Sequence, residues 1–320
     1  MSELNLQEVL DFAIDLAKKA GKAISDGQAK RFTEGTAAET KKNSADLLTE
    51  VDQATEKLVK EAITAKYPDH AFIGEESAQG SESVPEGGCW IVDPIDGTTN
   101  FVHGFPYCCI SIGFTYKKEP VMGVIYAPFL DHLYYALQGH GAYLVTAQAP
   151  EPRRLPLAKP TPLPSMRQAV VAMEWGSDRR SEILEAKLQS FRRLCGDPED
   201  VEGGKMVQGI RSIGSAALVS ASIAAGSIDV YYEIGTWSWD QCAGTAILRE
   251  AGGVTVGSKA WTSKALASDS MFGTVPPEVL MGRKYLSIRA IGDTPQESGR
   301  AAQKRLIKEF YDAVVEFDPK

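Results

Sequence analysis

The fold of this chain is decided by the stretch WIVDPIDGTTNF at residues 90–101. A short apolar run ends in two carboxylates, Asp93 and Asp96, with Pro94 between them, and a glycine turn with two threonines follows. Carboxylates three residues apart on a stiffened backbone can converge on one hard divalent cation, because such ions prefer oxygen ligands. The stretch therefore predicts a strand that delivers two ligands to a metal.

A tight turn is a simpler interpretation of the same residues, because Asp, Pro, Gly and Thr all favour turns. A calcium-binding EF-hand needs a glutamate at the twelfth loop position, and the twelfth residue counted from Asp93 is Gly104, so the spacing excludes it. If Thr98 and Thr99 begin a helix, their N–H groups would face an anion, and Gly97 would let that anion come close. The metal interpretation thus predicts a phosphate site beside the cation.

Three other acidic positions are candidates for the same site. Glu75 lies in the run GEES at residues 74–77, directly after an apolar run; Asp240 follows Trp239 in WSWDQCAG, and Asp52 follows Thr49 in LLTEVDQ. Each also has a local explanation, since paired glutamates are usually solvated and an acid in the first turn of a helix is stabilised by the helix dipole. Only their combination with the 90–101 stretch favours a shared site.

Length and composition indicate a globular protein with two lobes. A chain of 320 residues with 43% hydrophobic residues exceeds the usual single core. The proline-rich segment 150–164 is the predicted boundary, which gives an α+β lobe with the metal site at 1–150 and an α/β lobe that completes the metal and substrate site at 151–320.

Charge and cysteine content narrow the partners and the compartment. A formal net charge of −8 argues against nucleic acid. Five cysteines without CxxC spacing favour reduced thiols in the cytoplasm, and the acidic amphipathic N-terminus is unlike a signal peptide. The longest uncharged run, residues 212–228, is too short and polar for a membrane span and is predicted to be a packed helix.

Periodicity predicts two helices, a sheet and then alternating strands and helices. The first helix is expected over about 6–25, a loop or weak hairpin over 26–46 and a second helix from residue 51. A mostly antiparallel sheet is expected from residue 71 to 145. The second half alternates, as in α/β layers, and should end with a strand at 287–291 and a helix from a capping box at 294–297 to about Phe317.

Motifs for other catalytic strategies are missing from the sequence. The four histidines have no metal-ligand spacing, and no GxSxG, GxGxxG or GxxxxGKS pattern occurs. The sequence therefore gives no support to a covalent serine mechanism or to a nucleotide cofactor.

Taken in order, the acidic blocks resemble the inositol monophosphatase family of metal-dependent, lithium-sensitive phosphatases. WIVDPIDGTTNFVHGFP at 90–106 and WDQCAGTAILREAGG at 239–253 carry most of this resemblance, which extends from the first helix to about Ser270. It implies a layered α-β-α-β-α sandwich, a Mg²⁺-dependent phosphomonoesterase and a homodimer.

The resemblance also implies ligands for two or three Mg²⁺ ions. Glu75, Asp93 and the carbonyl of Ile95 would hold the first ion, and Asp93, Asp96 and Asp240 the second, with Glu75 reaching a third, weaker ion. An attacking water would be activated by Thr98 with Asp52 behind it and by Glu75. The residues implied to contact the phosphate or the substrate hydroxyls are Lys42, Asp96, Gly97, Thr98, Ser177, Gly214, Ser215, Ala216 and Glu233.

These implications make inositol monophosphates the expected substrates, hydrolysed to inositol and phosphate. Adenosine 3′,5′-bisphosphate and fructose 1,6-bisphosphate, as substrates of related phosphatases, are the alternatives. A non-catalytic sensor of phosphorylated ligands or metal is the alternative from another class, and a calcium buffer is the least favoured. The chain departs from the family pattern at Trp237, which is expected to reshape the alcohol pocket, and in a tail beyond Met281.

Overall fold

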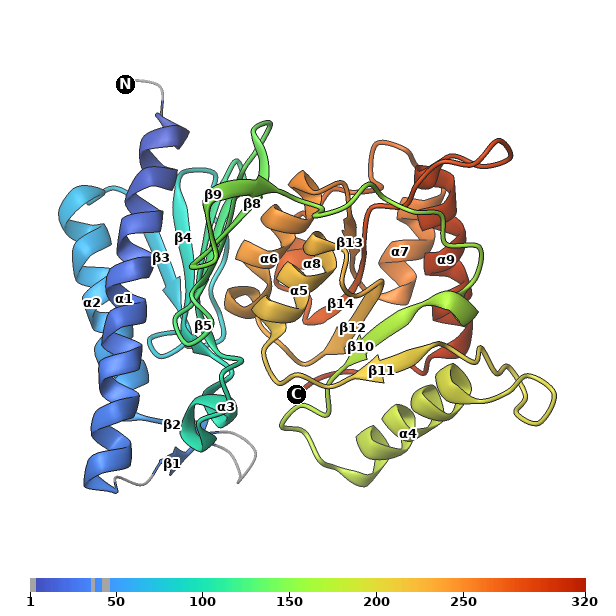
Figure 1. The fold of residues 1–320 in the computed structure, drawn as a ribbon, viewed down its shortest axis with the longest axis horizontal. Coiled ribbons are helices and arrows are strands. Elements are labelled where there is room, and N and C mark those ends of the chain that lie inside the picture. Colours follow the sequence, from blue (N-terminus) through green and yellow to red (C-terminus); the bar gives the residue numbers. More distant parts are fainter. Residues whose placement is uncertain (1–3, 36–37, 42–46) are drawn as a thin grey trace.

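Two β-sheets stand side by side, with helices between them and on both outer faces (Figure 1). The structure, a computed structural model, describes residues 4–35, 38–41 and 47–320. The order of layers is α-β-α-β-α, so the predicted fold class is confirmed.

The first sheet has seven strands and is antiparallel except where β3 and β4 pair in parallel. Its strands, in their order across the sheet, are β3 (Ala71–Gly74), β4 (Cys89–Asp96), β5 (Cys109–Tyr116), β6 (Glu119–Ala127), β7 (His132–Leu137), β8 (Gly141–Thr146) and β9 (Ala149–Arg154). β9 begins the proline-rich segment. It contains Pro150 and Pro152, which suits the last strand of a sheet, because an edge strand need not donate every ladder hydrogen bond.

The second sheet has five strands of mixed direction. Its strands, in order, are β11 (Gly209–Arg211), β10 (Val170–Met173), β12 (Val230–Ile234), β14 (Lys284–Ile288) and β13 (Val254–Val256). β14 lies three residues earlier than predicted, because Tyr285 and Leu286, which point to opposite faces of the sheet, are both buried and their backbones pair with β12. The division of the chain into lobes near residue 150 stays a prediction.

The helices occupy three layers. On the outer face of the first sheet lie α1 (Leu6–Glu34) and α2 (Glu50–Lys66), and between the sheets lie α5 (Ala216–Ala225), α6 (Ser238–Glu250) and α8 (Pro277–Leu280). On the far side of the second sheet lie α4 (Ser181–Cys195), α7 (Lys259–Leu266) and α9 (Gly299–Ala313). The short elements are α3 (Thr98–His103), the 3-10 turn η1 (Met166–Gln168) and the hairpin strands β1 (Glu39–Thr40) and β2 (Leu47–Leu48).

α1 is longer than predicted, and the segment expected to be a loop from residue 26 is helical as far as Glu34. The apolar stripe ends at Ile24, but buried polar residues continue it. Gln28 donates to the Phe101 carbonyl at 2.6 Å, and Arg31 pairs with Glu50 at 2.7 Å. Apolar periodicity missed these turns because their buried side chains are polar.

The predicted C-terminal helix is wrong at both ends. The Thr294 hydroxyl accepts from the backbone N–H of Glu297 at 3.0 Å, which makes a turn rather than a helix start. α9 begins at Gly299, with the Ser298 hydroxyl accepting from the N–H of Ala301 at 3.2 Å, and ends at Ala313. The residues after α9 are not helical and run past α4, where the Val315 N–H donates to the Ser190 hydroxyl at 2.9 Å.

No helix within the described ranges is both long enough and apolar enough to cross a membrane. All five cysteines are unpaired thiols.

Candidate active site

The C-terminal end of β4 positions the first two carboxylates. All eight residues of the strand are buried, and its pairing with β5 is irregular between Asp93 and Asp96, where Pro94 interrupts the ladder. The N–H of Ile95 donates to Asp93 Oδ1 at 2.9 Å, which fixes the first carboxylate. The strand thus places Asp93 and Asp96 at one edge, with exposed fractions of only 2% and 5%.

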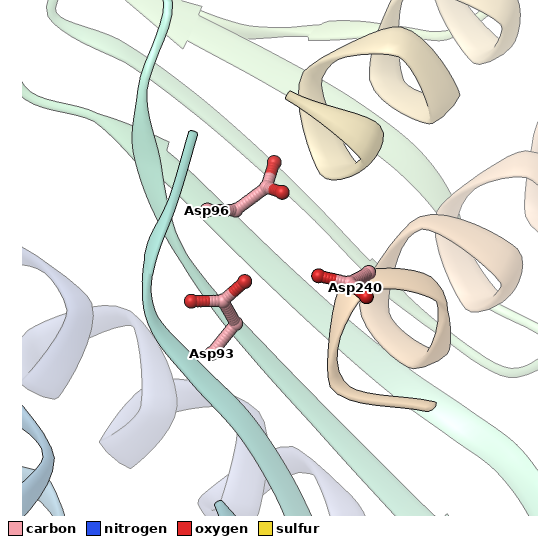
Figure 2. A group of neighbouring side chains, drawn as sticks. All are labelled: Asp93, Asp96 and Asp240. Carbon is pink, nitrogen blue, oxygen red and sulfur yellow. The ribbon is translucent and has the colours of Figure 1, made fainter. Parts of the chain in front are cut away.

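The third carboxylate comes from the other half of the chain. Asp240 lies in the first turn of α6 and accepts from the N–H of Trp237 at 2.5 Å. One oxygen each of Asp93, Asp96 and Asp240 lies within 4.8 Å of the others, and the three side chains point toward one another (Figure 2). The predicted convergence of Asp93 and Asp96 with Asp240 is therefore present in the fold.

Electrostatics favour a cation at this point. Burial, together with the charges of Asp96 and Glu75, raises the pKa of Asp240 to about 8, and burial raises that of Asp96 to about 6. The pKa of Asp93 is raised well above its usual value by burial and by the charges of Glu75, Asp96 and Asp240. Without a cation, ionising all three carboxylates costs free energy. A hard divalent ion such as Mg²⁺ prefers oxygen ligands and would neutralise their charge.

Asp96 also binds the N-terminus of α5. It accepts from the N–H groups of Ala216 at 3.2 Å and Ala217 at 2.9 Å, and from the Ser215 hydroxyl. These donors stabilise the ionised form of the buried carboxylate. Ser215 and Ala216, predicted to contact substrate, lie directly against the carboxylate cluster.

Two segments predicted to bind phosphate and substrate meet at Gly97 and Gly214. Gly97 precedes α3 with φ of 89°, and a Cβ there would come within 2.9 Å of the Gly214 carbonyl and 3.0 Å of the Tyr107 carbonyl. The Asn100 amide bridges the carbonyls of Tyr107 at 2.7 Å and Ile213 at 2.8 Å. A larger residue at position 97 would push these segments apart.

Thr98 and Asp52 form a hydrogen-bonded pair next to the cluster. Thr98 Oγ1 lies 3.3 Å from Asp52 Oδ1 and 3.1 Å from the Ile95 carbonyl, and it can donate to either. Asp52 also accepts from the Thr49 N–H at 2.8 Å in a capping box of α2. Burial raises the pKa of Asp52 to about 6, although the hydrogen bond from Thr49 opposes the shift. The carboxyl can therefore exchange a proton near neutral pH.

Glu75 lies close to the cluster but is held by a lysine. Lys41 Nζ is 2.7 Å from both Glu75 and Glu76, and their charges raise its pKa above the usual value despite burial. Burial and the charge of Glu75 raise the pKa of Glu76 to about 7. Lys42, the predicted phosphate contact, lies outside the described residues, so that prediction stays open.

Ser177 and Glu233 line a pocket of about 690 Å³ that also contains Glu75 and Asp240. Glu233 is 2% exposed, and burial raises its pKa to about 8, although Lys187 at 3.9 Å opposes the shift. All predicted site residues within the described ranges thus lie around the cluster or in this adjoining pocket.

Glu174 and Asn100 support the site and Arg283 lines the adjoining pocket, and none of the three was predicted. Glu174 accepts from the N–H groups of Ile213 at 2.6 Å and Gly214 at 3.0 Å, and so holds the turn before α5. Asn100 belongs to the opening stretch and was detectable there as the polar residue after the two threonines. Glu174 and Arg283 belong to no recognisable motif.

The fold and the carboxylate cluster together define a phosphatase-type α/β sandwich with a metal-binding site. A sequence profile described as the Inositol monophosphatase family matches residues 5–313. The chain belongs to the inositol monophosphatase family, and its members with this fold are phosphoric monoester hydrolases.

Some curated relatives match nearly the whole chain, and others match about four fifths of it. "Protein qutG" of Emericella nidulans is 40% identical over 99% of this chain and 96% of its own, and "Quinic acid degradation cluster protein x" of Neurospora crassa is 38% identical over 98% and 95%. "Inositol monophosphatase 1" of Rattus norvegicus is 38% identical over 78% of this chain and 83% of its own.

Solved structures share the architecture. The SuhB protein of Bartonella henselae superposes with a TM-score of 0.70 at 26% identity over 93% of this chain and 97% of its own. Inositol monophosphatase II of Staphylococcus aureus gives 0.67 at 27% identity over 96% of both chains.

Proposed function

We propose that this enzyme is a Mg²⁺-dependent phosphomonoesterase that hydrolyses inositol monophosphates to inositol and phosphate. One observation carries the proposal: the cluster of three aspartates shares Asp240 with the pocket that Ser177 and Glu233 line. A phosphate ester can place its phosphate against the cluster and its alcohol in the pocket.

Mg²⁺ ions, two or three of them, would be held by Glu75, the Ile95 carbonyl and the three clustered aspartates. When bound, they would supply Lewis-acid stabilisation of the phosphate oxygens and of the leaving alkoxide. A bound divalent ion would offset the burial and the nearby negative charges that raise the pKa values of Asp96 and Asp240.

The protein's own groups orient the nucleophile. Thr98 Oγ1 has one proton, and donating it to Asp52 or to the Ile95 carbonyl leaves a lone pair to accept a hydrogen bond from water. Asp52 can then receive a proton through the Thr98 hydroxyl, because its pKa of about 6 leaves it mostly ionised at pH 7. Gly97 lets a phosphate oxygen approach the N–H groups at the start of α3.

Support for inositol phosphates comes from relatives. The rat relative and a Saccharomyces cerevisiae relative at 38% identity are named inositol monophosphatases, and one S. aureus structure is described as bound to inositol monophosphate. Another structure of that S. aureus enzyme is described as bound to 2′AMP, which favours a nucleotide as the second candidate. The relatives that match nearly the whole chain are not named for inositol phosphates.

The deciding experiment measures phosphate release from inositol 1-phosphate, adenosine 3′,5′-bisphosphate and fructose 1,6-bisphosphate with Mg²⁺, and again with Li⁺. We expect turnover of inositol 1-phosphate and inhibition by Li⁺. Negligible turnover of inositol 1-phosphate beside robust turnover of another ester would reject the substrate. No hydrolysis of any phosphomonoester would favour a non-catalytic sensor, and tight Ca²⁺ binding without turnover would favour a buffer.

Assembly and location belong to the same proposal. We expect a homodimer in the cytoplasm that acts on a small phosphate ester rather than on nucleic acid or a membrane. Sedimentation velocity tests the dimer directly, since a species of 34.6 kDa at all concentrations would reject it.

A further inference from the structure

The pocket that contains Glu75 and Asp240 continues into a basic end. Its acidic end adjoins the carboxylate cluster, and its other end is formed by the segment 176–187, the start of β14 and the chain's last residues. The basic residues that line it are Arg179, Arg180, Lys187, Arg283 and Lys320. A ligand with its phosphate at the cluster would therefore point its alcohol toward positive charge.

Nearby acids balance two of these charges. Arg180 pairs with Asp178 at 2.7 Å. Lys187 lies 3.9 Å from Glu233 and donates to the carbonyls of Glu174 at 3.0 Å and Trp175 at 2.7 Å. These contacts occupy most of the hydrogen-bond donors of both side chains. Neither residue is therefore the main candidate for binding a ligand anion.

Arg179 and Arg283 are different. Among the residues that the structure describes, neither forms an ion pair with an Asp or Glu side chain. Arg179 is exposed at the pocket wall, and its Nε donates to the Gly176 carbonyl at 2.8 Å. Two guanidinium groups that line one pocket without an Asp or Glu partner favour an anion there.

Arg283 is held in place before any ligand binds. Its Nη2 donates to the Gly235 carbonyl at 2.6 Å and its Nη1 to a main-chain oxygen of Lys320, the last residue of the sequence, at 2.8 Å. Its guanidinium lies 3.7 Å from the ring centroid of Trp237. Its buried Nε has no hydrogen-bond partner within the described part of the chain. The remaining N–H groups can donate to a planar anion without reordering the side chain.

The backbone at Arg283 also indicates a constrained position. Its φ of 57° lies in the left-handed region, where residues other than glycine are uncommon. Such conformations are retained where the surroundings fix them, often at binding sites. Here the two main-chain oxygens and the Trp237 ring fix the side chain.

Trp237 is poorly placed to bind a nucleobase. It stacks on Trp239, with centroids 5.1 Å apart and ring planes at 14°, and the Arg283 guanidinium lies over it. These two neighbours cover much of the π-surface that a base would need. The basic end is therefore better suited to a small anion than to a purine.

We propose that the preferred substrate is a phosphate ester whose leaving alcohol carries a second anionic group, a carboxylate or another phosphate, which binds Arg283 and Arg179. This inference rests on the proposed phosphomonoesterase activity and concerns only which alcohol the site prefers. Inositol, which is uncharged, would occupy the pocket without using these two side chains.

Three esters of one six-carbon skeleton test the proposal. Glucitol 6-phosphate has an uncharged alcohol, 6-phosphogluconate replaces one terminal hydroxymethyl by a carboxylate, and glucitol 1,6-bisphosphate carries a second phosphate. Relative to glucitol 6-phosphate, we expect kcat/KM with Mg²⁺ to be roughly tenfold higher or more for at least one of the two esters that carry a second anionic group, which is the size of one charge-assisted hydrogen bond. Which of the two is preferred identifies the group as carboxylate or phosphate. Equal values for all three esters would overturn the proposal.

Two variants locate the effect. Arg283→Gln and Arg179→Gln should each lower kcat/KM for the preferred anionic ester roughly fivefold to tenfold or more, and that for glucitol 6-phosphate less than about twofold. Arg153→Gln, on the exposed edge strand β9, removes the same charge far from the pocket and should change neither. An equal loss for charged and uncharged esters in both pocket variants would overturn the assignment.

A binding measurement separates this inference from the proposed function. Asp93→Asn protein, which we expect not to turn the esters over, can be titrated calorimetrically with the three esters in Mg²⁺. Tighter binding of a charged-end ester, weakened by Arg179→Gln, supports the inference even if hydrolysis is never detected. Hydrolysis of glucitol 6-phosphate with no preference in rate or binding would retain the phosphatase and reject the anion site.

Discussion

The two ends of the active-site pocket are built in different ways. At the chemical end, short aspartate side chains are fixed by backbone N–H groups: Ile95 on Asp93, Ala217 on Asp96 and Trp237 on Asp240. At the alcohol end, long side chains are held by main-chain oxygens, as Lys187 and Arg283 are.

This difference separates reaction from specificity. Carboxylates at a strand end and at a helix start cannot move far, which suits a site that must keep metal ions in one geometry. Long basic side chains on α4, on loops and on the final residues can change without disturbing that geometry. We therefore expect variants at the chemical end to lower kcat for every ester, and variants at the alcohol end to change the order of preference among esters.

The largest effect is expected for Asp93→Asn. Asp93 contributes to both implied metal sites, so the variant should lower kcat by roughly a thousandfold or more for all esters, since a metal ion supplies several kcal/mol of transition-state stabilisation. Phosphate release at saturating Mg²⁺ measures it. Asp178→Asn, in the same pocket but at the basic end, is the matched control and should change kcat less than about threefold. Similar losses of kcat in the two variants would contradict the assignment of kcat to the chemical end alone.

Thr98→Ala should have the next largest effect. Removing the hydroxyl that connects water to Asp52 is expected to lower kcat roughly a few hundredfold, within the range for general acid–base groups, with a smaller change in KM. Thr98→Ser keeps the hydroxyl and should recover at least about a tenth of the wild-type kcat. If the serine variant is as impaired as the alanine variant, the threonine acts through packing and not through proton transfer.

Magnesium should stabilise the folded protein most at alkaline pH. The pKa values of Asp96 and Asp240 in the fold, about 6 and about 8, exceed the roughly 4 of a free aspartate. The contribution of these groups to metal-free stability is therefore fully present below about pH 4 and is lost as pH rises through 6 to 8. Mg²⁺ at a hundred times its Kd should add roughly 2.7 kcal/mol where the cluster is ionised.

Thermal unfolding with EDTA and with MgCl₂ at pH 5.5 and pH 8.5 checks this prediction. The Mg²⁺-induced rise in Tm should be larger at pH 8.5, and Asp93→Asn should reduce it. A rise that is equal at both pH values, or larger at pH 5.5, would contradict a site made of these carboxylates.

The chemical end was predictable because its residues lie in contiguous motifs. A strand followed by DPIDG places Asp93 and Asp96 by local geometry, and the acid after Trp239 sits where a helix begins. The layered fold was predictable from alternating periodicities. The end of α1 was not, because Gln28 and Arg31 occupy buried positions that apolar periodicity does not detect.

The alcohol end was only partly predictable. Ser177 and Glu233 came from the family resemblance, but Arg283 and Phe317 reach the pocket through tertiary packing of segments without a motif. Phe317 was expected at the end of a helix, whereas the extended tail after Ala313 brings it to the pocket wall. The ion pair of Lys41 with Glu75 was also beyond local pattern, since the segment has no periodicity.

The smallest effect that still tests the comparison is expected for Glu174→Gln. Glu174 connects the two ends: its Oε1 accepts from Ile213 and Gly214 before α5, and its carbonyl accepts from Lys187. The amide keeps an acceptor oxygen but loses the charge, so each hydrogen bond weakens without leaving a cavity. We expect KM to rise roughly threefold to tenfold, with kcat changed less than about threefold, because the turn shifts while Asp93 and Asp240 do not. Steady-state kinetics on charged and uncharged esters measures both constants. A loss confined to kcat would place Glu174 with the chemical end, and would mean that the turn before α5 positions Asp96 and not the alcohol.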